Sequence, residues 1–434
     1  MTKFDIKNAE FETVALHGGQ EVDRDTQSRG VPVYRTSSYL FKSTDHAANL
    51  FSLKESGFIY TRIGNPTQDV LERRLAQLEG GPAALALASG ANAIFYSIVN
   101  ICAAGDEFVS SSSLYGGTYS MFKDIFPQFN IGLKFFDINN PAEIREKITK
   151  KTKAVYIETI SNPSLDVADI RSIAAIAHEH ELPLIVDSTF TTPYLLKPIT
   201  YGADIVIHSL TKWIGGHGTG IGGIVVDAGR FNWKNPKFTL YNVPDTGYHG
   251  MRFGHDLGEL SPIAFILRMR LVPLRNLGGC ISPDNAWIFL QGIETLGMRM
   301  ERHSKNALAA AKYLNAHPKV AWVRYPGLPG DKTYSTAKEC LDRGFGGMVV
   351  FGIKGGKENG RKFIENLALF SHLANVGDAK SLAIHPASTT HSQLGDDDLR
   401  ASGITPDLIR LSIGIENVKD IINDIEQALE GVPV

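Results

Sequence analysis

A single lysine, Lys212, lies between an apolar run and a cluster of glycines. The run Ile205–Ile207 is followed by His208, Ser209 and Thr211, and the glycines begin three residues after the lysine. α/β proteins place their chemistry at strand ends, and a primary amine placed there can act as a nucleophile toward a carbonyl group. A lysine beside glycines is also a common solvated loop residue, so the role of Lys212 depends on its neighbours.

A carboxylate occupies an equivalent place in the sequence. Asp187 directly follows the apolar run Leu184–Val186. The carboxyl ends of strands in a doubly wound sheet open onto one crevice, so Asp187 and Lys212 are expected to share it. A carboxylate at such a position is costly unless it is paired. Two interpretations of Asp187 remain open, a charge partner in a site and a cap for the segment that follows.

A turn of small residues forms a candidate anion cradle. The apolar run Ala83–Ala88 leads through Ser89 and small residues into the helix-compatible segment 94–104. A strand, a tight turn and a helix N-terminus present free N–H groups and the positive end of a dipole to an anion. Many α/β proteins have such a turn without a ligand, and that alternative stays open. The candidate donors are Gly90, Ala91, Ser209 and Thr211.

Together these groups match the needs of pyridoxal 5'-phosphate. Lys212 would form a Schiff base with the aldehyde, Asp187 would keep the ring nitrogen protonated, and the cradle would take the phosphate. An aromatic side chain would stack on the ring, and Tyr115 is the candidate. The residues alone therefore predict a pyridoxal-phosphate site.

The elements that must position these residues follow from alternating patterns. Between residues 83 and 226, short apolar runs alternate with segments of helical spacing, which predicts a mostly parallel sheet covered by helices on both faces. Ahead of them, Asn65 and Pro66 supply a cap and a first-turn proline for a helix that Gly80 and Gly81 end. The expected strands are Ala83–Ala88, Glu107–Ser110, Ala154–Glu158, Pro183–Val186, Ile205–Ile207 and Ile224–Val226.

The rest of the chain lacks this alternation of strands and helices. Residues 1–62 lack a sustained period and predict an arm, while the polar, aromatic and glycine-rich stretch 228–283 predicts a functional or partly disordered loop. After residue 284 a second mixture predicts a smaller α+β domain joined by a long helix. Its expected helices are Asp284–Leu296, Glu301–Asn315, Lys357–Asn366 and Val418–Leu429, and its strands are Val320–Arg324, Met348–Ile353 and Leu408–Ser412.

One pattern is misleading. Gly218, Gly220 and Gly223 match the dinucleotide motif G-x-G-x-x-G. That motif requires a helix after the glycines, whereas these run into the apolar segment Ile224–Val226. No nicotinamide site is therefore expected.

Composition excludes several classes of function. The chain has 434 residues, 43% hydrophobic and 21% charged, with a formal net charge of -2, which offers no basic field for nucleic acid. No apolar run is long enough for a membrane span, and the charged N-terminal residues lack a signal-peptide core, so a cytoplasmic protein is expected. No metal site or disulfide is expected either. The cysteines Cys102, Cys280 and Cys340 are far apart in the sequence, and His178 and His180 are two residues apart on an expected helix, so they point to different faces.

The motifs, in this order, resemble the Cys/Met-metabolism family of pyridoxal-phosphate enzymes. The resemblance spans nearly the whole chain. It implies an α/β protein of the aspartate-aminotransferase-like fold type I, with an arm (1–62) contacting a neighbouring subunit, a cofactor domain (63–283, insertion at about 228–262) and a C-terminal α+β domain (284–434). The matching motifs are Tyr60-x-Arg62-x-x-Asn65-Pro66-Thr67, Ser89-Gly90, Leu114-Tyr115-Gly116, Glu158-x-x-x-Asn162-Pro163, Val186-Asp187, Ser209-x-Thr211-Lys212 with Gly216-His217, the segment His385 to His391, and Ile409-Arg410-Leu411-Ser412.

The resemblance also implies residue roles. Lys212 would be the Schiff-base lysine and the proton shuttle, with Tyr60 or Tyr115 assisting. Arg410 would bind the substrate carboxylate, because a guanidinium offers a bidentate fork. Tyr60 and Arg62 would reach the phosphate of a neighbouring subunit, which implies a dimer and usually a tetramer built as a dimer of dimers. The remaining implied contacts are Asp187 to the ring nitrogen, Tyr115 to the ring face, Gly90, Ala91, Ser209 and Thr211 to the phosphate, Asn162 near the ring hydroxyl, and Asn375 beside the carboxylate.

Three features discriminate within the family. Gly117 stands where methionine gamma-lyases have cysteine, and Gly218-Thr219 stands where cystathionine synthases and lyases usually have Ser-Asp. The segment Pro244–Phe253 is similar to an insertion typical of O-acetylhomoserine sulfhydrylases. These features imply γ-replacement in methionine biosynthesis, in which O-acetyl-L-homoserine and sulfide give L-homocysteine and acetate. The alternatives are a cystathionine γ-synthase, a cystathionine or methionine lyase, or a partner-binding protein without catalysis.

Overall fold

The computed structural model describes residues 6–389 and 405–433, and it contains two sheets. The larger has seven strands in the order β1-β7-β6-β5-β4-β2-β3. Only β7 runs antiparallel to its neighbours, which confirms the expected mostly parallel sheet. The strands are β1 (Ala83–Leu87), β2 (Glu107–Ser111), β3 (Gly132–Phe136), β4 (Thr152–Glu158), β5 (Leu184–Asp187), β6 (Ile205–Ser209) and β7 (Gly223–Asp227). The edge strand β3 was not predicted from the sequence.

Helices cover both faces of this sheet, because side chains of each strand alternate between two buried clusters. On β4, Val155 and Ile157 join one cluster, and Ala154 and Tyr156 join the other. The first face is covered by α1 (Phe11–His17), α3 (Pro66–Glu79), α7 (Ile170–Glu179) and α12 (Pro283–Glu294), and the second by α4 (Gly90–Val99) and α10 (Ala264–Met269).

Helix α3 begins and ends as its sequence predicts. The Asn65 side chain accepts the N–H of Thr67, Pro66 is the first helical residue, and Gly80 ends the helix in the left-handed region at φ 87°. Shorter elements connect the large ones. They are α5 (Gly116–Ser120), α6 (Ile144–Lys147), α8 (Thr192–Leu195), α9 (Thr239–Asn242), α11 (Arg275–Leu277), six 3-10 turns (Ile6–Asn8, Phe126–Phe129, Pro141–Glu143, Pro198–Tyr201, Gly258–Ile263, Pro386–Ser388) and two π turns (Met121–Ile125, Arg270–Leu274).

The stretch after β7 is ordered rather than a loose loop, which corrects the expectation from its composition. Trp233 stacks on Tyr241, with ring centroids 4.6 Å apart, and packs against Phe238 and Phe265. These rings are buried and join the cluster on the second face of the large sheet. The packing of aromatic rings therefore gives this stretch a core, although its sequence has neither a helical nor a strand periodicity.

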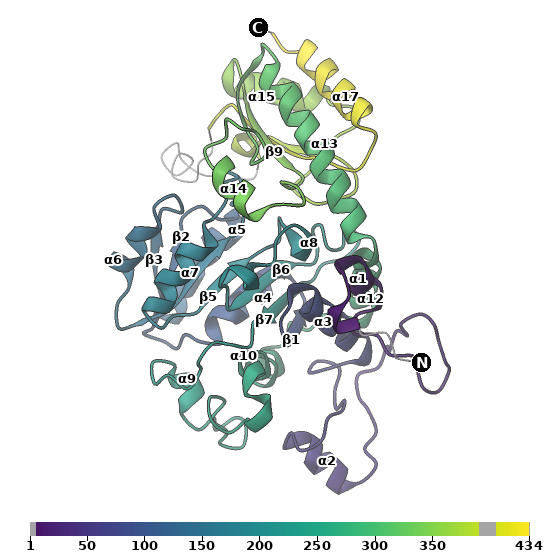
Figure 1. Cartoon of the computed structure of the whole chain (residues 1–434), viewed down its shortest axis with the longest axis vertical. Coiled ribbons are helices and arrows are strands. Elements are labelled where there is room, and N and C mark those ends of the chain that lie inside the picture. The colour runs from purple at the N-terminus through teal and green to yellow at the C-terminus, as the bar shows by residue number, and fades with distance from the viewer. Residues whose placement is uncertain (1–5, 390–404, 434) are drawn as a thin grey trace.

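The N-terminal residues are only partly an arm. Phe11, Val14 and Ala15 of α1 are buried against the first face of the large sheet. Helix α2 (Thr44–Phe51) lies far from that core, at the lower edge of Figure 1. It is held there by the stretch after β7, because the Tyr248 hydroxyl donates to the Phe51 carbonyl at 2.8 Å. The domain boundary at residue 62 stays a prediction.

The second sheet has five strands in the order β10-β11-β12-β9-β8. Together with its helices it confirms the expected smaller α+β unit. In Figure 1 this unit lies above the large sheet, and the long helix α13 runs between the two. None of the helices described is long and apolar enough to cross a membrane. The elements are α13 (Leu296–Ala316), β8 (Val320–Arg324), α14 (Tyr334–Cys340), β9 (Met348–Ile353), α15 (Gly356–Asn366), β10 (Ser371–His372), β11 (Leu382–Ile384), β12 (Leu408–Ser412) and α17 (Val418–Glu430).

A buried carboxyl group at the end of β7 makes stability depend on pH. Burial, and then the charge of Asp204, raise the pKa of Asp227 from 3.8 to about 7, while the N–H of Gly229 opposes the rise. The folded protein therefore holds this proton more tightly than the unfolded chain does. Its unfolding free energy falls as the pH rises from 3.8 through about 7.

Asp227→Asn is expected to remove this loss. At pH 8.5 the variant should be more stable than the parent by roughly 1–3 kcal/mol, and the advantage should shrink as the pH falls and vanish below 3.8. Calorimetric unfolding of the cofactor-loaded protein across this range measures the difference. The exposed Asp25→Asn change is the control, and a difference independent of pH would contradict the assignment.

Candidate active site

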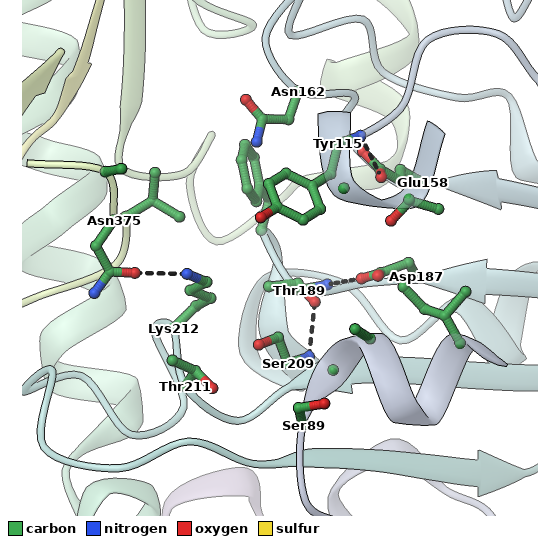
Figure 2. Close-up of a pocket in the computed structure, with 18 of the residues that line it drawn as sticks. Ser89, Tyr115, Glu158, Asn162, Asp187, Thr189, Ser209, Thr211, Lys212 and Asn375 are labelled. Carbon is green, nitrogen blue, oxygen red and sulfur yellow. Dashed lines mark hydrogen bonds between the residues drawn. The ribbon is translucent and has the colours of Figure 1, made fainter. Parts of the chain in front are cut away.

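A cavity of about 370 Å³ opens at the carboxyl ends of β4, β5 and β6 and reaches the second sheet. Figure 2 shows its side chains converging from both sheets. It brings together most of the residues predicted from the sequence. Those lining it are Gly90, Ala91, Tyr115, Asn162, Asp187, Ser209, Thr211, Lys212, Asn375 and Arg410.

The amine of Lys212 points into this cavity from the turn after β6. Its Nζ donates to Asn375 Oδ1 at 2.5 Å, and Asn375 lies in the loop between β10 and β11 (Figure 2). Burial, and then the positive charge of Arg410, lower the pKa of Lys212 from 10.5 to about 8. The amine therefore loses its proton more readily than an ordinary lysine does, as a nucleophile or a base requires.

The turn that carries Lys212 is held by a residue that the sequence did not single out. Arg299, on α13, donates to the carbonyl of Trp213 at 2.6 Å and to that of Ile214 at 3.1 Å. Gly216 has φ +75°, and a Cβ there would overlap the Arg299 guanidinium. The absence of a side chain at Gly216 therefore leaves room for the Arg299 guanidinium. The glycines lead into β7, a strand, whereas a dinucleotide loop would lead into a helix.

Two carboxyl groups end neighbouring strands beneath the cavity. Asp187 on β5 and Glu158 on β4 are register partners, and both are buried. Asp187 Oδ1 accepts the N–H of Thr189 at 3.0 Å, which confirms the cap, and its place in the lining of the cavity leaves the role of charge partner as a prediction. Burial raises the pKa of Asp187 above its usual value.

The expected anion cradle is formed where α4 begins. Ser89 Oγ accepts the N–H of Asn92 at 3.1 Å, and the other N–H groups of the first helical turn have no intrahelical acceptor. A Cβ on Gly90 would lie 2.7 Å from the Cβ of Ser209, so only glycine lets α4 approach β6 this closely. The Thr211 hydroxyl accepts the N–H of Gly222 at 3.1 Å and so also holds the glycine loop.

A cationic group lines the same cavity from the second sheet. Arg410 on β12 donates through Nη1 to Asn162 Oδ1 at 3.0 Å. Burial lowers its pKa to about 10, which still leaves it positively charged at neutral pH. Among the described residues no carboxylate forms an ion pair with Arg410. The guanidinium is therefore free to receive an anionic ligand.

Two predicted residues lie outside this cavity. The Arg62 guanidinium donates to the carbonyl of Arg275 and lies 5.3 Å from the ring centroid of Tyr60. Neither residue lines the cavity of its own chain. In the motif near residue 385, Thr390 and His391 lie outside the described residues.

The histidine expected at the surface of α7 has a partner. His178 Nε2 lies 2.8 Å from Oδ2 of the buried Asp204, at the end of the sheet opposite the cavity. Across the part of the chain that the structure describes, no three His, Cys, Asp or Glu side chains form a group able to hold a metal ion.

The arrangement has known counterparts. The family profile described as Cys/Met metabolism PLP-dependent enzyme matches residues 12–430. The chain belongs to this family. Pyridoxal phosphate is therefore its cofactor, as the residues alone had predicted.

Individual members of the family resemble the whole chain. An O-acetyl-L-homoserine sulfhydrylase of Leptospira meyeri is 55% identical over 98% of both chains. A homocysteine synthase of Schizosaccharomyces pombe is 50% identical over 98% of this chain and 99% of its own. The crystal structure of a putative O-acetylhomoserine (thiol)-lyase from Campylobacter jejuni, which contains N'-pyridoxyl-lysine-5'-monophosphate, is 41% identical. It superposes with a TM-score of 0.93 over 97% of this chain and all of that one. This likeness confirms the predicted fold type.

The cavity fits the family's cofactor on its own geometry. A buried carboxyl group with a raised pKa at Asp187 suits a cationic ring nitrogen, since such a partner stabilises the ionised form. The first turn of α4 suits a phosphate, and the Lys212 amine suits an aldehyde carbon. We infer from this fit the assignment of each residue to its part of the cofactor.

Gly117 determines where the Tyr115 ring can lie. A Cβ at this glycine would come 2.6 Å from Cε1 of Tyr115, closer than packed carbon atoms approach. Gly117→Ala should therefore displace the ring and weaken binding of pyridoxal phosphate by about 2- to 10-fold, the value of one aromatic stacking contact.

Titration of cofactor-stripped protein with pyridoxal phosphate tests this prediction. Gly30→Ala is the matched control, because no atom lies within 4 Å of a Cβ at that position. Equal dissociation constants for Gly117→Ala and the parent would contradict it.

Proposed function

We propose that this protein catalyses γ-replacement in methionine biosynthesis, converting O-acetyl-L-homoserine and sulfide into L-homocysteine and acetate. The observation that carries the proposal is the convergence of Lys212, Asp187 and Arg410 on one cavity, in a chain 55% identical to an O-acetyl-L-homoserine sulfhydrylase. Relatives named homocysteine synthase and homocysteine/cysteine synthase, at 50% and 48% identity, support the same reaction.

The chain supplies groups for each requirement of this reaction. When bound, pyridoxal phosphate supplies an aldehyde and an electron-accepting ring that stabilises negative charge on the substrate. Asp187 would hold the proton on the ring nitrogen, and the Tyr115 side chain would stack on the ring. The Lys212 amine, whose pKa is about 8, moves protons at the α- and β-carbons of the amino acid. Loss of acetate from the γ-carbon then opens that position to sulfide.

Substrate recognition rests on the second sheet. Arg410 binds the α-carboxylate through two parallel N–H groups. Asn162 accepts from the Arg410 guanidinium and orients it, and Asn375 accepts from the Lys212 amine and orients that. Asn375 accepts from Lys212 through its amide oxygen, which leaves its amide N–H groups to donate to a carboxylate.

Product analysis separates this reaction from its alternatives. Purified protein is supplied with O-acetylhomoserine and sulfide, with O-acetylhomoserine and cysteine, or with cystathionine or methionine alone. We expect homocysteine from the first mixture as the main product. Cystathionine from the second mixture would favour a cystathionine γ-synthase, and 2-oxobutyrate from the last would favour a lyase. Replacing the acetyl ester by the succinyl ester identifies the preferred donor.

Arg410→Lys should impair substrate binding selectively. A lysine keeps the charge but loses the planar fork, so KM for O-acetylhomoserine should rise about 10- to 100-fold, as expected for loss of a charged hydrogen bond. KM for sulfide and the visible absorption of the cofactor should change little, and both serve as internal controls. An unchanged KM for the amino acid would reject Arg410 as its carboxylate ligand.

The proposal includes the assembly. Tyr60 and Arg62 lie outside the cavity of their own chain and close to the surface, where Tyr60 is 40% exposed. We assign them to the cofactor phosphate of a neighbouring copy, in a dimer that pairs further into a tetramer. A mixture of Lys212→Ala and Arg62→Ala chains should regain activity through hybrid dimers with one intact site. A cytoplasmic location belongs to the same proposal, and cell fractionation tests it.

A further inference from the structure

Glu158 lines the cavity without a role in the reaction outlined above. Its Oε1 accepts the backbone N–H of Tyr115 at 2.8 Å, a contact visible in Figure 2. Tyr115 is the residue that precedes α5, and its backbone nitrogen is bonded to the Cα that carries the ring. A hydrogen bond to this N–H therefore fixes the position of the ring more directly than a contact elsewhere on the loop.

The surroundings of Glu158 disfavour its negative charge. Its register partner on β5 is Asp187, and neighbouring strands lie only ~4.8 Å apart. Two carboxyl groups on adjacent register positions of one sheet do not readily ionise together. Burial, and then Asp187, raise the pKa of Glu158 well above its usual value, while the N–H groups of Tyr115 and Asn162 oppose the rise. The cationic groups of the cavity, Lys212 and Arg410, form no ion pair with it.

The division of charge between the two carboxyl groups follows from the cofactor. Asp187, assigned above to the ring nitrogen, would gain a cationic partner when the cofactor binds, so it is the member of the pair expected to ionise. Glu158 has the Tyr115 N–H as its partner, and a neutral carboxyl group accepts that N–H through its carbonyl oxygen.

We propose that Glu158 is a positioning residue that, in its neutral form, holds the Tyr115 N–H and thereby fixes the Tyr115 ring over the cofactor. This inference rests on the family's cofactor rather than on the substrate proposed above. Its tests need no substrate, so failure of the sulfhydrylase assignment would not affect them.

Two substitutions distinguish an acceptor from a charge. Glu158→Gln keeps a carbonyl oxygen for the Tyr115 N–H, whereas Glu158→Ala leaves that N–H without its acceptor. We expect the alanine variant to bind pyridoxal phosphate about tenfold more weakly and to lose most of the visible circular dichroism that the bound cofactor shows. The glutamine variant should bind within about twofold of the parent, with its dichroism retained.

A second background separates positioning from general stability. In Tyr115→Ala protein the ring is absent, so adding Glu158→Ala should weaken cofactor binding by less than about twofold more. An equal tenfold loss in both backgrounds would overturn the proposal, because Glu158 would then act on the cofactor or the fold independently of the ring.

The charge of Glu158 can be read even if the alanine variant does not fold. In Glu158→Gln protein the pH dependence of the cofactor's visible absorption should shift by less than about half a pH unit. An ionised Glu158 would give a shift of about 1 unit or more on neutralisation. Such a shift, or a glutamine variant as defective in dichroism as the alanine variant, would overturn the proposal.

Discussion

Lys212→Ala is expected to lower homocysteine formation by about four orders of magnitude or more. Its amine combines two roles, the covalent attachment of the cofactor and proton transfer at the substrate carbons, and proton transfer alone contributes about 10²–10⁴-fold. The amine lies in the cavity with a pKa of about 8. Among the residues that the structure describes, no other lysine lines that cavity.

Two measurements check this result. Turnover is followed with O-acetylhomoserine and sulfide, and the visible absorption of the purified protein reports attachment of the cofactor through the lysine. Lys234→Ala removes an exposed lysine and should leave both unchanged. Retention of both signals in the Lys212→Ala protein would refute the assignment of this residue.

Asp187→Asn is expected to lower kcat by about 10²–10³-fold. The amide has the shape of the carboxyl group and can still accept the N–H of Thr189, but it offers no negative charge to a ring nitrogen. The loss corresponds to about 2.7–4 kcal/mol, the value of a preorganised electrostatic partner at a site of developing charge. Cofactor binding should weaken less than catalysis.

Asp187→Glu and Glu158→Gln are the controls for this effect. The first keeps a negative charge at β5 and should recover part of kcat, while the second removes a neighbouring carboxyl group and should leave kcat within about tenfold of the parent. Equal losses in Asp187→Asn and Glu158→Gln would contradict the different roles assigned to the two carboxyl groups.

The main elements could be predicted because their patterns are local. Asn65, Pro66 and Gly80 mark the ends of α3, and the run Leu408–Ser412 is a strand with the predicted bounds. Asp187 and Lys212 could be placed in one crevice because parallel strands end on the same edge of a sheet. The stretch after β7 escaped prediction because Trp233 and its neighbours form a core through ring packing that has no period.

The parts of the site that depend on distant contacts were less accessible. Arg410 lies on β12 and Asn375 in the loop between β10 and β11, and no spacing in the sequence brings them to Lys212, so the resemblance to the family supplied them. Arg299 reads as one polar residue of a long helix, and only the fold shows that it holds the turn after Lys212. Glu158 belongs to one of the matching motifs, and the pattern that identifies Asp187, an acid at a strand end, applies to it equally.

The position of Arg299 has a consequence for protein engineering. Helix α13 packs with the second sheet, yet Arg299 in its first turn donates hydrogen bonds to the backbone that follows Lys212. A chimera that takes its C-terminal part from a relative would therefore also exchange the support of the catalytic lysine. Recombination after α13 should preserve that support, whereas recombination between α12 and α13 would require a donor whose helix carries an arginine that fits beside Gly216.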